Sequence, residues 1–136
     1  MNPTSKDISD ILVNLGQGVF ASQLDWGIYI GNEPTSPSKC ITLYDTNGRV
    51  PGYYANKSLE PTQRNSLQVR VRSTSYLSAH NKLYGIACLL EQYGRFDKEG
   101  YHYTSIHRTS DFLFLERQES DLCVWVTNFN IEKEKI

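Results

Sequence analysis

Two short segments decide the fold class of this 136-residue chain: Gln68-Val69-Arg70-Val71-Arg72 and Leu43-Tyr44-Asp45-Thr46-Asn47-Gly48. In the first segment valines alternate with polar side chains, which is the period-two pattern of a strand with one buried face. The second segment continues a strand pattern and ends in a turn. Neither segment carries an obvious catalytic group, and Gln68, Arg70 and Arg72 are expected on one face of the same strand.

Apolar residues at helical spacing predict two helices in the rest of the chain. The first follows Thr4 or Ser5, and the second follows Ser73 or Ser75 and ends near Gly94. Strands are expected at residues 26–30, 40–44, 67–72, 103–106, 112–115 and 122–129. Residues 1–136 are therefore predicted to form a single α+β domain, an antiparallel or mixed sheet with two helices packed on one face.

Two segments depart from this regular pattern. Residues 46–66 contain glycines, prolines, asparagines and the adjacent Tyr53 and Tyr54, so the sequence predicts one long loop there. A loop of about 20 residues is unusual in a compact domain and is commonly functional. Residues 132–136 are predicted to form a charged tail after the last strand.

Charge and composition narrow the function classes. Lys+Arg 14 against Asp+Glu 15 gives a formal net charge of -1, which does not support a nucleic-acid binder driven by overall positive charge. No apolar run approaches the ~18 residues of a membrane span, and residues 1–10 lack a signal-peptide core. We therefore expect folding in a cytoplasm and no membrane partner. Cys40, Cys88 and Cys123 are widely spaced within apolar segments, which favours reduced thiols.

The sequence carries no recognisable catalytic or metal-binding motif. His102 and His107 are five positions apart, which places them on opposite faces of one regular strand, and His80 is expected on the solvated side of the second helix. His-Glu-x-x-His, Cys-x-x-Cys, Gly-x-Ser-x-Gly and the phosphate-binding glycine motif are all absent. We expect a protein that is not an enzyme, with no cofactor, no metal and no catalytic residue.

Arginines on the predicted central strand suggest a contact surface instead. Arg70 and Arg72, with Tyr44 and Tyr53 expected nearby, suit either single-stranded nucleic acid or a protein partner. Arginine and tyrosine are both enriched at protein interfaces. The near-neutral charge of the chain favours the protein partner.

Aromatic and apolar residues point to an oligomer. Tyr53, Tyr54, Tyr101 and Tyr103 are expected in loops or at strand ends, outside the core pattern. The run Phe112-Leu113-Phe114-Leu115 is apolar on both faces, and in a small monomer one of those faces would be exposed to water. Such a chain is expected to bury surface against copies of itself or a neighbour.

Several motifs together resemble one protein family. The segment Glu33-Pro34-x-x-Pro37-x-x-Cys40-Ile41-Thr42-Leu43-Tyr44-Asp45-Thr46-x-Gly48-x-x-Pro51 resembles a signature of tailed-phage minor capsid proteins, a family similar to the tail-terminator (tail-completion) proteins. The segment 68–72 followed by Tyr76 and Ala79, and the closing Asn128-Phe129-Asn130-Ile131, also resemble that family. The resemblance runs from about Asp7 to Ile131, and the chain departs from the pattern near residues 116–121.

The resemblance implies a structural, non-enzymatic virion protein with a tail-terminator-like fold. Such proteins form a ring, typically a hexamer, at the head-proximal end of the tail tube. The ring ends tube polymerisation and provides the surface on which the filled head docks. The implied partners are further copies of the chain, the tail tube protein and head-tail connector proteins, and DNA passes through the lumen without specific binding.

The resemblance also gives candidate interface positions. The sheet around residues 43–45 and 68–72 would be the ring scaffold, and the 46–66 loop would reach a neighbour, the lumen or the tube. Arg70 and Arg72 are expected to pair with acids of the next subunit, for example Glu116 or Glu119. The full set of candidate interface residues is Gln68, Arg70, Arg72, Tyr53, Tyr54, Glu116 and Glu119.

Two alternatives remain open at this point. A head-tail connector or neck protein of the same virion would differ only in the partner it touches. A nucleic-acid-binding module would use Gln68, Arg70, Arg72 and nearby tyrosines, and its binding would depend strongly on salt.

Overall fold

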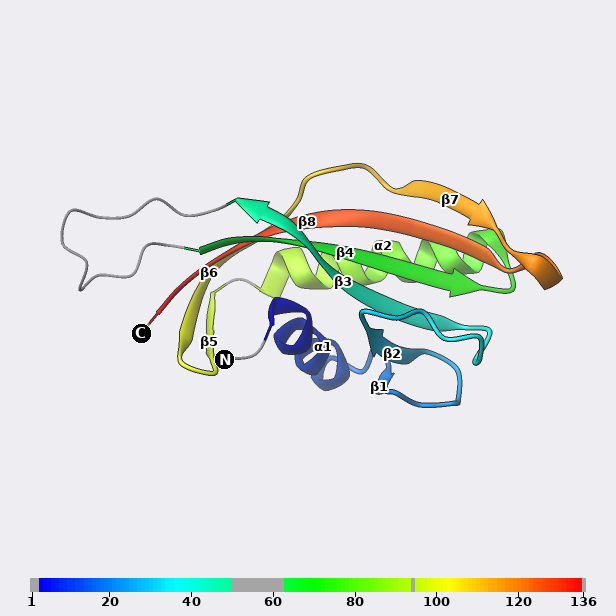
Figure 1. Ribbon diagram of the computed structural model, residues 1–136, viewed down its shortest axis with the longest axis horizontal. Coiled ribbons are helices and arrows are strands. Elements are labelled where there is room, and N and C mark those ends of the chain that lie inside the picture. Colours follow the sequence, from blue (N-terminus) through cyan, green and yellow to red (C-terminus); the bar gives the residue numbers. More distant parts are fainter. Residues whose placement is uncertain (1–2, 50–62, 94, 136) are drawn as a thin grey trace.

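The computed structural model describes residues 3–49, 63–93 and 95–135. Within these residues a mixed sheet of eight strands packs with two helices (Figure 1). The elements in chain order are α1 (Thr4–Asn14), β1 (Val19–Phe20), β2 (Gly27–Ile30), β3 (Cys40–Arg49), β4 (Gln63–Ser73), α2 (Tyr76–Tyr93), β5 (Phe96–Lys98), β6 (Tyr101–Arg108), β7 (Leu113–Arg117), a short 3-10 turn (Glu119–Asp121) and β8 (Cys123–Lys135). The predicted α+β fold with two helices is confirmed.

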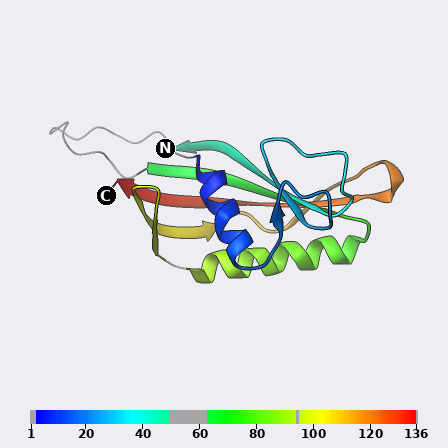
Figure 2. The same ribbon diagram turned by 90° about the horizontal axis from the view of Figure 1, so that it is seen from below.

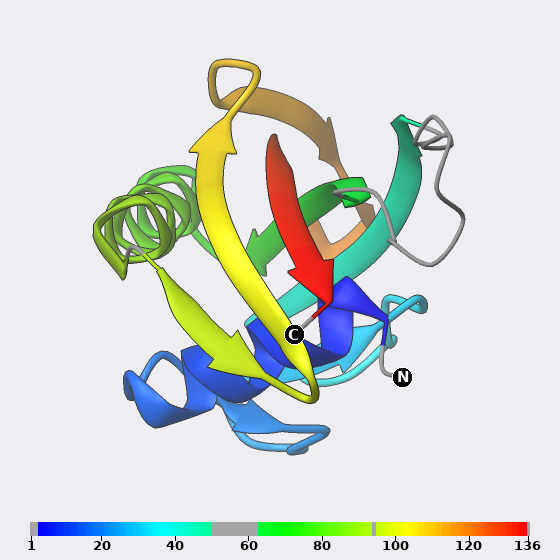
Figure 3. The ribbon, with the colours of Figure 1, turned by 90° about the vertical axis from the view of Figure 1, so that its left-hand side faces the viewer.

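The sheet is built on three long central strands. Its order is β1-β2-β3-β4-β8-β6-β5, and β7 pairs with the first part of β8 beside β6. β1, β2 and β3 are parallel neighbours, whereas β3, β4, β8 and β6 pair antiparallel. The sheet curls, so that β7 and β1 lie on opposite sides of the molecule (Figure 3).

The two helices cover one face of this sheet. Leu67, Val69 and Val71 of β4 are fully buried, and they belong to the same apolar cluster as Leu12 of α1 and Leu83 of α2. α2 lies along the long axis of the molecule and α1 runs across it (Figure 2). We call the opposite face of β3, β4 and β8, which carries Gln68, Arg70 and Arg72, the outer face.

The Asp45 side chain of β3 completes the start of α1. The backbone N–H of Ser5 donates to Asp45 Oδ1 at 3.0 Å, and the Ser5 hydroxyl donates to Asp45 Oδ2 at 2.5 Å. A carboxylate at this position satisfies free N–H groups and interacts favourably with the helix dipole. Pro3 is the N-cap residue and makes no side-chain cap bond. The capping side chain therefore comes from strand β3, and not from Thr4 or Ser5 as the sequence predicts.

The start of α2 follows the sequence prediction. The N–H of Ser78 donates to the Ser75 hydroxyl at 3.4 Å, which is the usual geometry of a serine cap. Ala79, Leu83, Ile86, Ala87 and Leu90 form its buried stripe. The sequence therefore located both the cap and the buried side of this helix correctly.

The predicted boundaries of the 46–66 loop and the 132–136 tail were wrong. β3 continues to Arg49 and β4 begins at Gln63, with Thr46 opposite Ser66 and Arg49 opposite Arg64. Residues 50–62, which include Tyr53 and Tyr54, lie outside the described residues. β8 runs to Lys135, because β6 and β4 both pair with its last residues, and Lys133 is only 2% exposed.

Two tyrosines expected on the surface lie in the core instead. Tyr103 is fully buried and Tyr101 is 9% exposed. The ring of Phe96 stacks on that of Tyr103, with centroids 4.5 Å apart, and the Tyr103 hydroxyl donates to Asp7 of α1. β6 begins at Tyr101, earlier than predicted, and β5 and α1 cover this end of it.

Candidate interaction surface

A charged cluster occupies the outer face beside the segment that joins β2 to β3. Arg70 Nη2 lies 2.9 Å from Glu33 Oε2 and 3.5 Å from Glu116 Oε1. The Arg70 guanidinium carbon also lies 5.8 Å from the centre of the Tyr44 ring. Arg70 and Glu33 side chains are 18% and 12% exposed, so their charges are partly shielded from water and interact more strongly than a surface pair.

Arg72 is the more deeply buried arginine, at 4% exposure. Its Nη2 donates to the Pro37 carbonyl at 2.7 Å and its Nε donates to the Ser38 carbonyl at 3.3 Å. Its Nη1 lies 3.6 Å from Glu33 Oε1. Arg72 therefore holds the β2–β3 connection against β4, and both predicted interface arginines have partners inside their own chain.

The other predicted acid, Glu119, lies at the rim of this cluster. It lines an open hollow together with Glu33, Pro34, Thr35, Arg72, Gln118 and Leu122. Glu119 is exposed, and Glu116 is 49% exposed despite its contact with Arg70. The structure thus brings Arg70, Arg72 and Glu116 together and places Glu119 beside them.

The rest of the outer face is polar. Arg64 Nε lies 3.4 Å from Glu132 Oε1, and the Ser66 hydroxyl donates to Asn130 Oδ1 at 3.2 Å. Gln68 is half-buried in the same row of β4, opposite Tyr44 and Asn128 on the neighbouring strands. This part of the face carries both signs of charge and amide groups, rather than a basic stripe.

The histidines differ from their predicted placement. A register shift between Tyr103 and Ser105 lets His102 and His107 pair with Glu134 and Asn130, so both lie on the outer face. His80 is half-buried, and its ring contacts Trp125 and Phe112 edge-on. Among the described residues, no group of three or more histidine, cysteine or acidic side chains is arranged to hold a metal ion. No helix in residues 3–49, 63–93 and 95–135 is long and apolar enough to cross a membrane.

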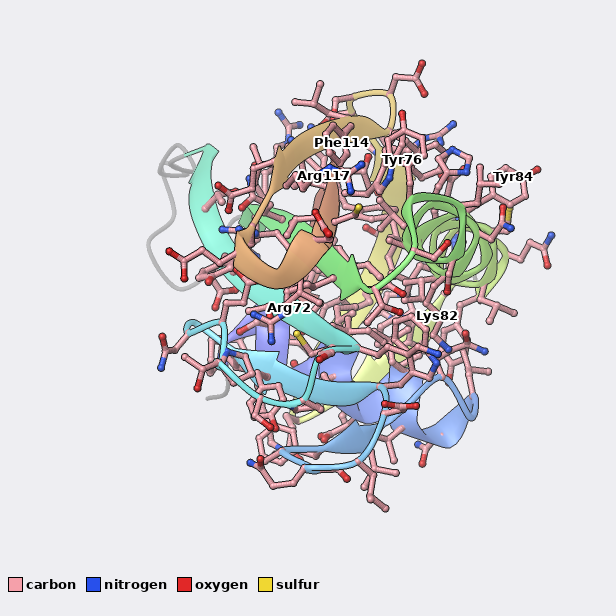
Figure 4. All side chains as sticks on the ribbon, turned by 90° about the vertical axis from the view of Figure 1, so that its right-hand side faces the viewer. Arg72, Tyr76, Lys82, Tyr84, Phe114 and Arg117 are labelled. Carbon is pink, nitrogen blue, oxygen red and sulfur yellow. The ribbon has the colours of Figure 1, made fainter. Side chains whose placement is uncertain are left out.

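Exposed apolar residues gather where α2 meets β7. Tyr76, Leu77 and Tyr84 of α2 are 43%, 67% and 54% exposed, and Leu113 and Leu115 of β7 are 58% and 44% exposed. We call these five residues the α2–β7 patch. Tyr76 and Phe114 lie side by side between the helix and the strand, with ring centroids 5.0 Å apart (Figure 4). Phe114 is opposite Trp125 on the face of β7 toward α2, whereas Leu113 is opposite Val126 on the other face, so the patch includes residues on both faces of this edge strand. The prediction that the 112–115 run has a wet apolar face is confirmed.

A second apolar group lies at the other end of the sheet. Val19 and Phe20 of β1 and Leu24 of the following loop are 60%, 46% and 78% exposed. We call these three residues the β1 patch. The Lys6 Nζ lies 4.5 Å from the centre of the Phe20 ring, and Lys82 Nζ lies 4.9 Å from that of the neighbouring Trp26. The sequence does not predict this group, because Val19 and Phe20 are too few to form a recognisable strand pattern.

Comparison with protein-family models places the chain in a class of phage proteins. Residues 11–135 match the family model described as bacteriophage tail terminator protein. Because the match covers most of the chain, the chain belongs to the bacteriophage tail terminator protein family, and it is a structural protein of a phage tail. The resemblance predicted from the sequence is confirmed.

A solved structure supports the fold independently. A chain from the virion of the native gene transfer agent particle superimposes with a TM-score of 0.54 at 10% sequence identity. The alignment covers 79% of this chain and 78% of that chain. No curated protein matches the chain in a sequence search.

Proposed function

We propose that this protein forms a ring of six copies at the head-proximal end of the tail tube in the virion. The ring ends polymerisation of the tube and provides the surface on which the head docks. Its partners are further copies of the chain, the tail tube protein and head-tail connector proteins. Assembly takes place in the host cytoplasm.

The observation that carries this proposal is the exposed α2–β7 patch in a chain of the tail terminator family. A group of exposed large apolar side chains of this kind typically marks a protein contact site. Closing a ring buries such surface on every subunit without leaving an open end. A solitary subunit would leave Leu77 and Leu113, both more than half exposed, in water.

The charges of the outer face fit a ring through which DNA passes. Arg70 and Arg72 each contact Glu33 inside the chain, so they are not a free cationic pair. Tight phosphate binding needs several free cations, and the formal net charge here is -1. These pairs argue against the nucleic-acid-binding module, and they fit a lumen along which DNA slides without being retained.

The proposal is tested by adding the purified protein to tail tube protein of the same phage while the tubes polymerise. Electron microscopy of negatively stained samples should show tubes that stop growing and carry one ring at one end. Bovine serum albumin at the same concentration serves as the control for crowding. Tubes that grow to the same length with bare ends, or a protein that binds connectors but not tubes, would contradict the proposal and favour the connector side of the joint.

A further inference from the structure

We infer that neighbouring subunits join head to tail, with the α2–β7 patch of one copy packed on the β1 patch of the next. This inference rests on the proposed ring, because it identifies the surfaces that a second copy of the chain would cover. The proposed contact is heterologous, which means that two different patches meet and every subunit uses both.

The two patches lie where such a contact requires them. β1 is the outermost strand at one end of the sheet order, and β7 pairs with β8 on the far side of β4. Viewed along the molecule, Tyr76 and Phe114 lie at the top, whereas β1 lies at the bottom (Figure 4). When two complementary surfaces lie on opposite sides of one subunit, each copy can bind the next in a row. A constant rotation between neighbouring copies then closes that row into a ring.

Both patches also include the free edge of a strand. β1 pairs only with β2, through bonds such as Val19 N–H to Trp26 O at 3.2 Å, and β7 pairs only with β8. Among the described strands, neither has a second neighbour in the sheet. Exposed edges with apolar side chains favour contact with another chain, since that contact shields both side chains and backbone groups.

Acidic residues are in excess around the α2–β7 patch, and basic residues are in excess around the β1 patch. Six acids and four arginines lie on or near the elements of the α2–β7 patch: Glu33, Glu91, Asp111, Glu116, Glu119 and Asp121 with Arg70, Arg72, Arg108 and Arg117. Four lysines and two acids lie on or near the elements of the β1 patch: Lys6, Lys39, Lys82 and Lys98 with Asp10 and Asp25. A head-to-tail contact brings the acidic rim against the basic rim, whereas contacts between like patches oppose equal charges.

The test is chemical cross-linking of single-cysteine and double-cysteine variants on tail tubes. The starting chain carries Cys88→Ser, because Cys88 is the half-buried native thiol while Cys40 and Cys123 are buried. Leu24→Cys, Leu113→Cys and the double variant are each bound to tubes and treated with a short bismaleimide. Both positions are more than half exposed in the isolated subunit, so the substitutions leave the core unchanged. Thermal unfolding of each variant checks the fold before use.

The head-to-tail contact predicts a specific pattern of products. The double variant should give a ladder of linked species up to the full ring, and an equal mixture of the two single variants should give dimers that contain one copy of each. Each single variant alone should give at least about tenfold less dimer than that mixture. The matched control pairs Leu24→Cys with Tyr93→Cys, a residue 41% exposed at the far end of α2, and should give no ladder.

Other outcomes separate the failure of this inference from the failure of the proposed function. Dimers from Leu24→Cys alone or Leu113→Cys alone would show a contact between like patches and overturn the inference. Rings that are visible on tubes while the double variant gives no ladder would also overturn it, and the proposed function would stand. If the unmodified protein forms no ring on tubes, the proposed function itself fails.

Discussion

Arg70 of β4 and Glu33 of the β2–β3 connection form an ion pair, with Nη2 and Oε2 2.9 Å apart. The same carboxylate reaches Arg72, whose Nη1 lies 3.6 Å from Glu33 Oε1. Glu33 therefore bridges two arginines on the outer face and fixes the proline-containing connection against the sheet. These arginines, which the sequence suggested as contacts to another subunit, first stabilise their own chain.

Replacing Glu33 by Gln should destabilise the subunit. The change leaves Arg72, 4% exposed, beside a neutral partner, and breaking a buried ion pair by removing one charge costs about 3–5 kcal/mol when burial is complete. Because Arg70 and Glu33 retain some exposure, we expect a loss of about 2–3 kcal/mol in the free energy of unfolding. Urea denaturation followed by circular dichroism measures it.

The matched control is Glu132→Gln on the same face. Its partner Arg64 is 50% exposed, so the loss should stay below about 1 kcal/mol. Equal effects of the two substitutions would show that the Glu33 pair is no more than a surface contact.

Replacing Asp45 by Ala should weaken the attachment of α1. The Asp45 carboxylate accepts two hydrogen bonds from Ser5 at the start of the helix, and loss of a helix cap typically costs about 1 kcal/mol. Hydrogen exchange should become faster for the first turn of α1 and remain unchanged in α2. Unchanged exchange in the first turn would mean that Asp45 contributes nothing to helix stability.

The buried Lys133 should make stability depend on pH. Burial lowers the pKa of its ammonium group from the usual 10.5, and the nearby Asp7 and Asp45 oppose only part of this effect. The unfolded chain then binds this proton more tightly than the folded chain. The free energy of unfolding should rise as the pH increases from the lowered pKa toward 10.5.

The variant Lys133→Met isolates this contribution, because it removes the titrating group and keeps an unbranched side chain. Urea denaturation between pH 7 and pH 10 should show a smaller rise in stability with pH for the variant than for the natural chain. Parallel curves for the two proteins would contradict a shifted lysine pKa.

Cysteine reactivity should follow burial. Burial raises the pKa of the Cys40 thiol, an effect that the nearby Arg72 opposes only in part, and Cys123 is 1% exposed. A thiol reagent such as DTNB should modify Cys88 in the native protein, and Cys40 and Cys123 only after unfolding. Peptide mass spectrometry identifies the labelled residue, and rapid labelling of Cys40 in the native protein would contradict the buried position.

Much of the fold could be predicted from local patterns. The buried stripe of α2 and the alternation through Val69 and Val71 each carry their own periodic signal, so the sequence located them correctly. β1 and β5 were missed because two or three residues are too short to show a period. The ends of β3 and β4 near residues 46–49 and 63–66 look like loop in composition, but each strand supplies the other's backbone partners.

The tyrosines and histidines whose positions were predicted wrongly also depend on features that local sequence patterns do not show. Tyr101 and Tyr103 look exposed beside a charged turn, but they are buried by Phe96, α1 and β8, which are distant in the sequence or belong to an unrecognised strand. His102 and His107 share a face because one register shift changes the alternation, and periodicity alone cannot reveal a bulge. The ion pairs of Glu33 also depend on tertiary contacts, which local sequence patterns do not reveal. Its position in the segment that resembles the phage family was the sequence signal that could have pointed to this residue.

Ring formation is tested by the native mass of the protein, measured by multi-angle light scattering at several concentrations and then by sedimentation together with tail tubes. We expect either a closed species of about six times the 15.6 kDa chain, or a monomer that binds tubes only as one ring per tube end. A monomer at every concentration that does not sediment with tubes would contradict it.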